Sequence, residues 1–225
     1  MKVKYLFNLS VLILILLMCC LTLLGCGTKG KDSYTSSVEA DDIAKLSLFS
    51  YNGKGESTWG LMNLGHSFLS FENISDENIS ILDKVIAPNE TISIGTWSIL
   101  EHFGVWYNVE SVYIETTDKY NGRVSATIGV NSEDLEKIVS FISKKDKWNP
   151  INNCSYFALN LWNTVAKESE YINTPLIYTP TYIAEELAKF DSYEYNKPIP
   201  SSSKLGYFKN STYVSFDMEG GNESV

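Results

Sequence analysis

The chain has 225 residues, of which 44% are hydrophobic and 13% aromatic, and it carries 18 Lys+Arg against 27 Asp+Glu. This length suits one domain, and the apolar content is too high for a chain that is disordered throughout. A net charge of −9 argues against nucleic acid as a partner, because phosphate binding needs a basic face. Only two histidines and four cysteines are present, without metal-ligand spacing, so we expect neither a metal nor another cofactor.

Residues 1–25 have the pattern of a secretory signal. Two lysines precede an apolar run that ends at Leu24, and Gly25 stands directly before Cys26. This order resembles bacterial lipoprotein precursors with a lipobox. The resemblance implies cleavage before Cys26, a diacylglyceryl group on its sulfur, and anchoring to the extracytoplasmic face of the cell membrane. The alternative is an uncleaved transmembrane anchor, which the apolar length barely permits.

The rest of the chain divides into three parts. Loss of residues 1–25 removes two of the 18 basic residues, which leaves 16 against 27 acidic ones and a net charge of −11. So acidic a protein is not expected to lie flat on anionic lipid, and the lipid on Cys26 would hold it. Residues 26–41 are polar and aperiodic, which predicts a lipidated cysteine followed by a flexible tether. We assign 42–216 to the domain and 217–225 to a disordered tail.

The first part of the domain is rich in strand signals. Aromatic and aliphatic residues recur there near period two, and turn residues separate the runs. The segment 72–90 reads as a two-stranded insertion beside the cleft. The predicted strands are 43–51, 64–71, 78–82, 90–97, 104–115 and 122–129.

Three helices are predicted after the strands. The first follows Asn131-Ser132, a capping pair with two acidic residues in the next turn. The second begins near Cys154, and the third begins at Thr179-Pro180, where proline suits the first helical position. Strands followed by helices predict an α+β domain with an antiparallel sheet packed on helices.

Cys154 is the one cysteine that the lipoprotein interpretation leaves free. Cys19 and Cys20 lie in the segment that would be removed, and Cys26 would be lipidated. A thiol at a helix start has a lowered pKa, and with an imidazole partner it becomes a nucleophile for acyl transfer. His66 on the second predicted strand is the candidate partner. The alternative is a buried structural cysteine and a satisfied core histidine.

A resemblance favours the catalytic interpretation. Gly65-His66-Ser67-Phe68 on a strand, followed downstream by Asn153-Cys154 opening a helix, resembles circularly permuted papain-like proteins. These include permuted relatives of the NlpC-type cell-wall peptidases and the lecithin:retinol acyltransferase group. The resemblance covers roughly residues 43–190. It implies a permuted papain-like fold in which the His strand precedes the Cys helix.

The remaining members of such a site are less defined. A polar side chain must hold the imidazole tautomer, and Thr96, Asn108 and Glu110 are the candidates. We choose Asn108, because an amide accepts from a ring N–H without adding a buried charge. The Cys154 backbone N–H, with the side chain of Asn153, would hold the oxyanion.

Two further residues have expected roles outside this set. His102 is expected to be a structural loop residue. Trp148, just before the Cys helix, is the best candidate for an aromatic residue that lines the cleft.

These features predict a membrane-anchored thiol hydrolase that cleaves an amide in cell-wall peptide. Two alternatives stay open: a non-catalytic cell-surface binding lipoprotein, and an acyltransferase or thioesterase that acts on lipid-like acyl groups. The expected partners are therefore a peptide or acyl substrate and, through the anchor, the membrane. The sequence assigns no oligomeric state.

Overall fold

The structure is a computed structural model that describes residues 33–53, 65–99, 101–117, 119–200 and 204–216. The predicted signal peptide, Cys26 and the predicted tail 217–225 lie outside these ranges. No helix in the described ranges is long and apolar enough to cross a membrane. The buried core of the described residues lies within the compact unit Ser33–Val225. We therefore expect this unit to fold without the preceding residues.

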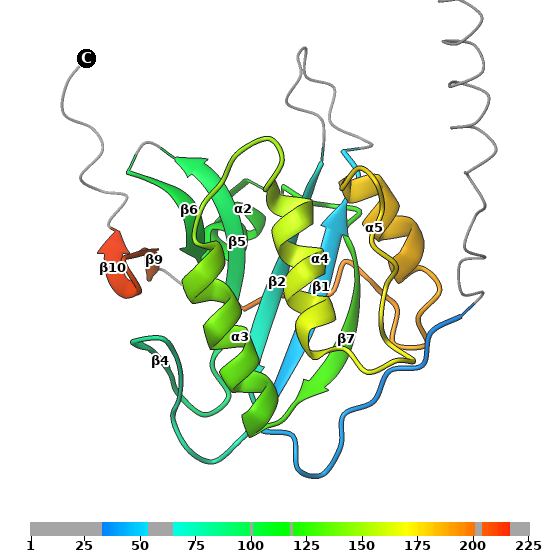
Figure 1. Cartoon of the computed structure of the whole chain (residues 1–225), viewed down its shortest axis with the longest axis horizontal. Helices are drawn as coiled ribbons and strands as arrows, with labels where there is room; N and C mark the ends of the chain where they lie inside the picture. Colours follow the sequence, from blue (N-terminus) through cyan, green and yellow to red (C-terminus); the bar gives the residue numbers. More distant parts are fainter. Residues whose placement is uncertain (1–32, 54–64, 100, 118, 201–203, 217–225) are drawn as a thin grey trace, which may run out of the picture. The chain divides into compact units, whose positions relative to one another are not determined.

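The centre of the fold is an eight-stranded antiparallel sheet (Figure 1). Its strands lie in the order β10-β9-β6-β5-β2-β1-β7-β8, and every adjacent pair is antiparallel. The strands are β1 (Ala44–Tyr51), β2 (His66–Asn73), β5 (Thr91–Ile99), β6 (His102–Tyr107), β7 (Val124–Val130), β8 (Glu194–Tyr195), β9 (Leu205–Lys209) and β10 (Thr212–Phe216). The predicted antiparallel α+β class is confirmed.

Four helices lie in the described ranges: α2 (Val109–Thr117), α3 (Ser132–Lys145), α4 (Cys154–Val165) and α5 (Pro180–Leu187). Helices α3, α4 and α5 cover one face of the sheet, and α2 lies behind it (Figure 1). Asn131, Asn153 and Thr179 cap α3, α4 and α5, each accepting a hydrogen bond from the backbone N–H three residues on. The three predicted helix starts are confirmed.

Both faces of the sheet are buried. Leu46, Leu48 and Leu69 belong to the largest apolar cluster, together with residues of α4. Phe49 and Phe68 point to the other face and form a second cluster with Tyr51, Tyr120 and Ile199. Since side chains alternate along a strand, His66 shares the face of Phe68, whereas Ser67 shares the face of Leu69 under α4.

The predicted strand 104–115 is wrong in its second half. Strand β6 ends at Tyr107, and α2 occupies Val109–Thr117. Asn108 between them has φ 62°, a left-handed conformation that asparagine tolerates better than most residues and that ends the strand. Tertiary contacts therefore override the β propensity of the segment after it.

The two-stranded insertion forms, but it does not lie beside the candidate site. Strands β3 (Ile79–Ile81) and β4 (Lys84–Ile86) pair with each other in a separate small sheet. The insertion leaves β2 at Asn73, whereas His66 stands at the opposite end of the same strand. Eight extended residues separate the two ends by roughly 25 Å.

The second half of the predicted tether is packed on the domain. The Tyr34 ring is buried and stacks on Phe190 with 4.4 Å between ring centroids, and its hydroxyl donates to Glu186. Ser36 donates to Asp191 through its backbone N–H, at 3.0 Å, and through its hydroxyl, at 2.7 Å. The ordered domain therefore includes Ser33–Asp41, and the prediction that it starts at 42 is corrected.

Candidate active site

Cys154 opens α4 and is half-buried. The Asn153 side chain holds this helix start, since its Oδ1 accepts from the Tyr156 backbone N–H at 2.9 Å. Its Nδ2 donates to the Tyr178 carbonyl at 3.2 Å, which joins the helix start to the segment before α5. The Cys154 thiol and the His66 imidazole interact closely enough to shift each other's pKa, so the two residues predicted to form the dyad do meet.

His66 approaches the thiol from the face of the sheet opposite α4. It is 8% exposed, and its ring lies 4.5 Å from that of Trp97 and 5.5 Å from that of Tyr120. The pairing of β2 with β5 starts only at Leu69, so the edge of β2 near Ser67 is not paired with β5. The Ser67 backbone there is one of the groups that lower the pKa of the Cys154 thiol. Nucleophile and imidazole therefore meet where β2, still paired with β1, is no longer paired with β5.

Glu110 holds the far side of the imidazole. Its Oε1 lies 3.0 Å from His66 Nε2 and accepts from Trp97 Nε1 at 2.7 Å, while Oε2 accepts from the Ser93 hydroxyl at 2.9 Å. The carboxylate is fully buried, and three donors satisfy it. Because Nε2 is used in this way, Nδ1 is the ring nitrogen that faces Cys154.

The turn at Asn108 and the glycine at position 95 explain how Glu110 reaches this position. Asn108 exchanges hydrogen bonds with Ser93: its backbone N–H donates to the Ser93 carbonyl, and its Oδ1 accepts from the Ser93 N–H. The chain then turns into α2, and Glu110 in the first turn extends over Gly95. A Cβ at Gly95 would lie 2.0 Å from Glu110 Oε1, so the carboxylate needs glycine beneath it.

The choice of Asn108 as the orienting residue is therefore corrected to Glu110. The Asn108 amide bonds the Ser93 N–H and the Lys204 carbonyl. Thr96 points to the other face of β5, and its buried hydroxyl has no hydrogen-bond partner among the described residues. Glu110 does bring a buried charge, but the His66 imidazole, the Trp97 indole and the Ser93 hydroxyl compensate it. Recognition of a helix start after Asn108 would have favoured it.

The site changes the pKa values of both reacting groups in opposite directions. Burial alone would lower the pKa of His66, but the Cys154 thiolate and then the Glu110 carboxylate outweigh it and raise the pKa to about 9. Burial alone would raise the pKa of the Cys154 thiol, but His66, the Ser67 N–H and the Ser155 hydroxyl lower it. Both shifts act in the direction that favours a thiolate–imidazolium pair over a neutral thiol and a neutral imidazole.

The proposed role of the Asn153 side chain at the oxyanion is not matched by its contacts. Both ends of its amide make structural hydrogen bonds, one to the helix start and one to Tyr178. The backbone N–H of Cys154, at the first position of α4, is one of the N–H groups for which a helix supplies no acceptor of its own, so it stays the candidate oxyanion donor.

A chain of serine hydroxyls, not foreseen from the sequence, lies behind the thiol. Ser155 and Ser67 hydroxyls are 3.2 Å apart, and those of Ser67 and Ser50 are 3.0 Å apart. Ser50 donates to the Pro180 carbonyl at 2.7 Å. The chain joins α4, β2, β1 and the start of α5, so it fixes the elements that carry both members of the dyad.

His102 forms a second histidine–carboxylate pair away from the thiol. Its Nε2 lies 2.6 Å from Asp146 Oδ1, which also accepts from the Val105 backbone N–H at 2.8 Å. The ring stacks on Tyr207 with 5.1 Å between centroids. His102 begins β6 and is not a loop residue as predicted, while the contacts agree with a structural role.

Three exposed aliphatic side chains border the start of α4: Ile151 at 80% exposure, Leu176 at 99% and Ile177 at 72%. We refer to these three as the apolar rim. Ile151 comes three residues before Cys154, and Ile177 precedes Tyr178, whose carbonyl accepts from Asn153. The two loops that carry the rim are thus joined directly at the start of the helix.

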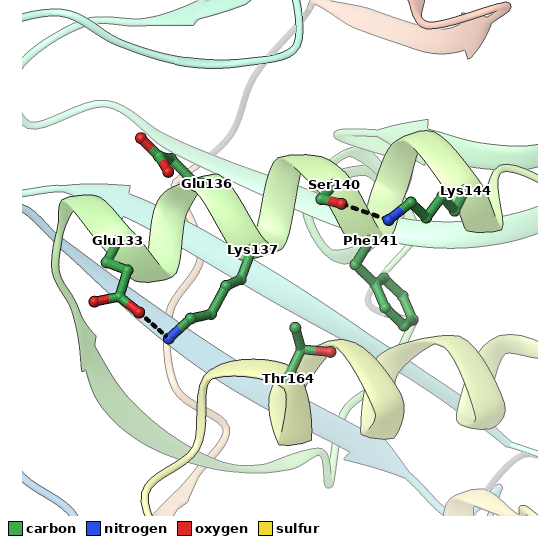
Figure 2. A pocket seen from close by; sticks show the side chains of 7 residues that line it. All are labelled: Glu133, Glu136, Lys137, Ser140, Phe141, Lys144 and Thr164. Atoms are coloured by element: carbon green, nitrogen blue, oxygen red, sulfur yellow. Dashed lines mark hydrogen bonds and ion pairs between the residues drawn. The ribbon is translucent and has the colours of Figure 1, made fainter.

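A surface groove of about 520 Å³ runs between α3 and α4 (Figure 2). Its charged groups largely satisfy each other: Lys137 lies 3.0 Å from Glu133, and Lys144 donates to Ser140. Figure 2 shows Phe141 and Thr164 pointing into the space between the helices. The groove is a solvated helix surface and contributes no group to the Cys154 site.

The described residues contain no cluster of three or more His, Cys, Asp or Glu side chains that could hold a metal ion. Comparison with protein-family models, with curated proteins and with solved structures found no match. The function is therefore inferred from the chemistry of the site and from the sequence resemblance.

Proposed function

We propose that the protein is a thiol-dependent hydrolase with a permuted papain-like domain, and that it cleaves an amide in cell-wall peptide. The observation that carries the proposal is the Cys154–His66–Glu110 arrangement, with a thiol of lowered pKa and an imidazole of raised pKa. A thiolate–imidazolium pair at a helix start is the activated form of a cysteine nucleophile.

The order of the elements supports the permuted papain-like assignment. The His strand β2 precedes the Cys helix α4 in the chain, and α4 packs on the antiparallel sheet with its first residue at the His strand. This is the arrangement that the sequence resemblance implied. Fold and chemistry remain separate inferences, because one fold can carry several activities.

The reaction follows from the two reacting groups. The Cys154 thiolate attacks the amide carbonyl, a C–S bond forms, and N–H groups at the start of α4 stabilise the oxyanion. The His66 imidazolium then gives its proton to the leaving amine as the C–N bond breaks, which leaves a thioester. Neutral His66 next takes a proton from water; the resulting hydroxide attacks the thioester, and the thiolate is released.

Glu110 acts through His66 in this scheme. Its carboxylate holds Nε2, so that Nδ1 faces the sulfur, and its negative charge stabilises the imidazolium. Glu110 is therefore a positioning residue, and it does not touch the substrate.

The membrane location is a second part of the proposal. The lipobox before Cys26 supports lipidation, and a lipid on that residue would hold the domain at the extracytoplasmic face. Cys26→Ser in the full chain should stop lipidation and move the protein out of the membrane fraction. A Cys26→Ser protein that fractionates with membranes as wild type does would instead indicate a transmembrane anchor.

An acyl group is the second candidate substrate, because the apolar rim beside the thiol suits a hydrocarbon chain better than a polar peptide. The test measures cleavage of short wall-type peptides, model esters and acyl thioesters by a protein that comprises residues 27–225. Release of amine from peptides alone supports the amidase, and cleavage of thioesters or esters alone supports the acyl alternative.

The variants for this assay are Cys154→Ala, His66→Ala and, as the matched control, His102→Ala. The control removes the other carboxylate-bonded histidine and should leave turnover unchanged. A wild-type protein that is as inert as Cys154→Ala on every substrate would overturn the hydrolase proposal and leave the binding-lipoprotein alternative.

A further inference from the structure

We propose that the edge of the domain around Cys154 rests on an anionic lipid surface. This docking edge consists of the apolar rim (Ile151, Leu176 and Ile177) with Lys145 and Lys147. The inference rests in part on the lipid anchor proposed above, and it goes further, because it states which edge of the domain faces the bilayer.

The exposure of the rim is the first observation. Leu176 is 99% exposed and Ile177 72%, although both are large aliphatic residues that a soluble domain ordinarily buries. Exposed aliphatic side chains that lie together, with polar residues around them, are typical of an interaction site. The contact of Tyr178 with Asn153 joins the loop of Leu176 and Ile177 to the loop of Ile151.

The charge around the rim is the second observation. Lys145 lies over the Tyr156 ring, and Tyr156 contacts Tyr178, so this lysine belongs to the same edge. Lys147 is exposed on the adjoining loop. Asp146 stands between the two lysines, but its carboxylate is bonded to His102 and to the Val105 N–H. The sequence contains no other Asp or Glu from 145 to 166 and none from 171 to 184, although the chain has 27 acidic residues. The net charge of the chain opposes contact with anionic lipid, but this edge is locally basic.

The short link to the predicted anchor is the third observation. Because Ser33–Asp41 are packed on the domain, the span from Cys26 to Ser33 is seven residues and covers at most roughly 25 Å when fully extended. A lipid on Cys26 would therefore keep the domain close to the bilayer, where weak contacts of the rim and the lysines become effective.

Docking in this way would place the thiol at the lipid surface. Ile151 precedes Cys154 by three residues, so insertion of the rim brings the start of α4 to the level of the head groups. The substrate would then be a group presented at the membrane surface.

The test uses residues 27–225, which contain the whole described domain but no anchor. We measure binding to vesicles of phosphatidylcholine alone and of phosphatidylcholine with phosphatidylglycerol in equal parts. Wild type should bind the anionic vesicles more tightly, and high salt should weaken this binding. Leu176→Ser with Ile177→Ser should weaken it by at least about tenfold, and Lys147→Glu by about fivefold at low salt.

Val85→Ser is the matched control, since Val85 is 51% exposed in β4, in the insertion far from the site, and it should leave binding unchanged. Wild-type protein that ignores anionic vesicles, or rim variants that bind as wild type does, would overturn the proposal. It would also be overturned if light scattering shows a dimer that the rim variants dissociate, because the occupant would then be a second copy.

The test of the docking edge can be separated from the test of the hydrolase. Cys154→Ala should bind vesicles as wild type does, because the thiol is not part of the docking edge. Protein that binds vesicles but cleaves nothing refutes only the hydrolase, whereas an active enzyme without vesicle binding refutes only the docking edge.

Discussion

The two histidines of this chain form two similar pairs in very different surroundings. His66 Nε2 lies 3.0 Å from Glu110, and His102 Nε2 lies 2.6 Å from Asp146. In each pair a glycine makes room: a Cβ at Gly95 would meet Glu110, and one at Gly104 would meet both Asp146 and His102. By these criteria alone the second pair is as well formed as the first.

The difference lies in what else touches the imidazole. His66 interacts with the Cys154 thiol and is enclosed by the rings of Phe68, Trp97 and Tyr120. His102 instead stacks on Tyr207 and pairs with Asp146. The Glu110 side chain is fully buried, while that of Asp146 is 14% exposed. We therefore read a histidine–carboxylate pair as structural unless a nucleophile faces the other ring nitrogen.

The largest expected effect separates the two histidines by turnover. Cys154→Ala and His66→Ala should each reduce turnover on the order of 10³-fold or more, and the double variant should lose little further, because the two residues act as one unit. His102→Ala should retain turnover. The measurement is kcat/KM on the best substrate. Additive losses in the double variant would contradict a shared step.

The two carboxylates, Glu110 and Asp146, should likewise differ in their effect on turnover. Above about pH 9 His66 loses the proton that the leaving amine needs, so kcat/KM should fall there. Because Glu110 raises the pKa of His66, Glu110→Gln should move this alkaline limb to lower pH and reduce kcat/KM on the order of 10²-fold. Asp146→Asn should leave the pH profile in place. An unmoved limb in Glu110→Gln would refute the positioning role.

The two glycines offer the smallest and most local change. Gly95→Ala places a methyl group 2.0 Å from Glu110 Oε1, so it should displace the carboxylate, reduce turnover and cost about 1–3 kcal/mol of stability. Gly104→Ala should cost a similar amount, because its methyl would lie 2.3 Å from Asp146 and His102, but it should leave turnover intact. Thermal unfolding should show similar losses of stability in the two variants, and kcat/KM should fall in Gly95→Ala alone. Equal losses of activity in both variants would contradict it.

Most of the central fold could be predicted from local sequence. Alternating residues marked β1, β2, β5 and β7, and the capping residues Asn131, Asn153 and Thr179 marked three helix starts. These signals lie within a few residues of the elements they define, so no tertiary information is needed to read them. The Cys154–His66 pair followed from the same local reading combined with the resemblance.

The missed features depend on contacts between distant segments. Helix α2 begins in a segment with good β formers, and it forms because Asn108 adopts a left-handed turn that Ser93 holds. Glu110 could be assigned only once that helix was known. Tyr34 lies in a polar stretch, and its burial against Phe190 requires a partner more than 150 residues away. Strands β9 and β10 likewise join the sheet through β6 at long range.

The most direct test of the central claim is the pH dependence of Cys154 alkylation by iodoacetamide in residues 27–225. We expect Cys154 to react at pH values below those at which an ordinary thiol reacts, because its pKa is lowered. The pH profile of alkylation should shift upward in His66→Ala and should not shift in His102→Ala. A Cys154 that reacts only after unfolding, or whose profile is the same in wild type and His66→Ala, would contradict the central claim.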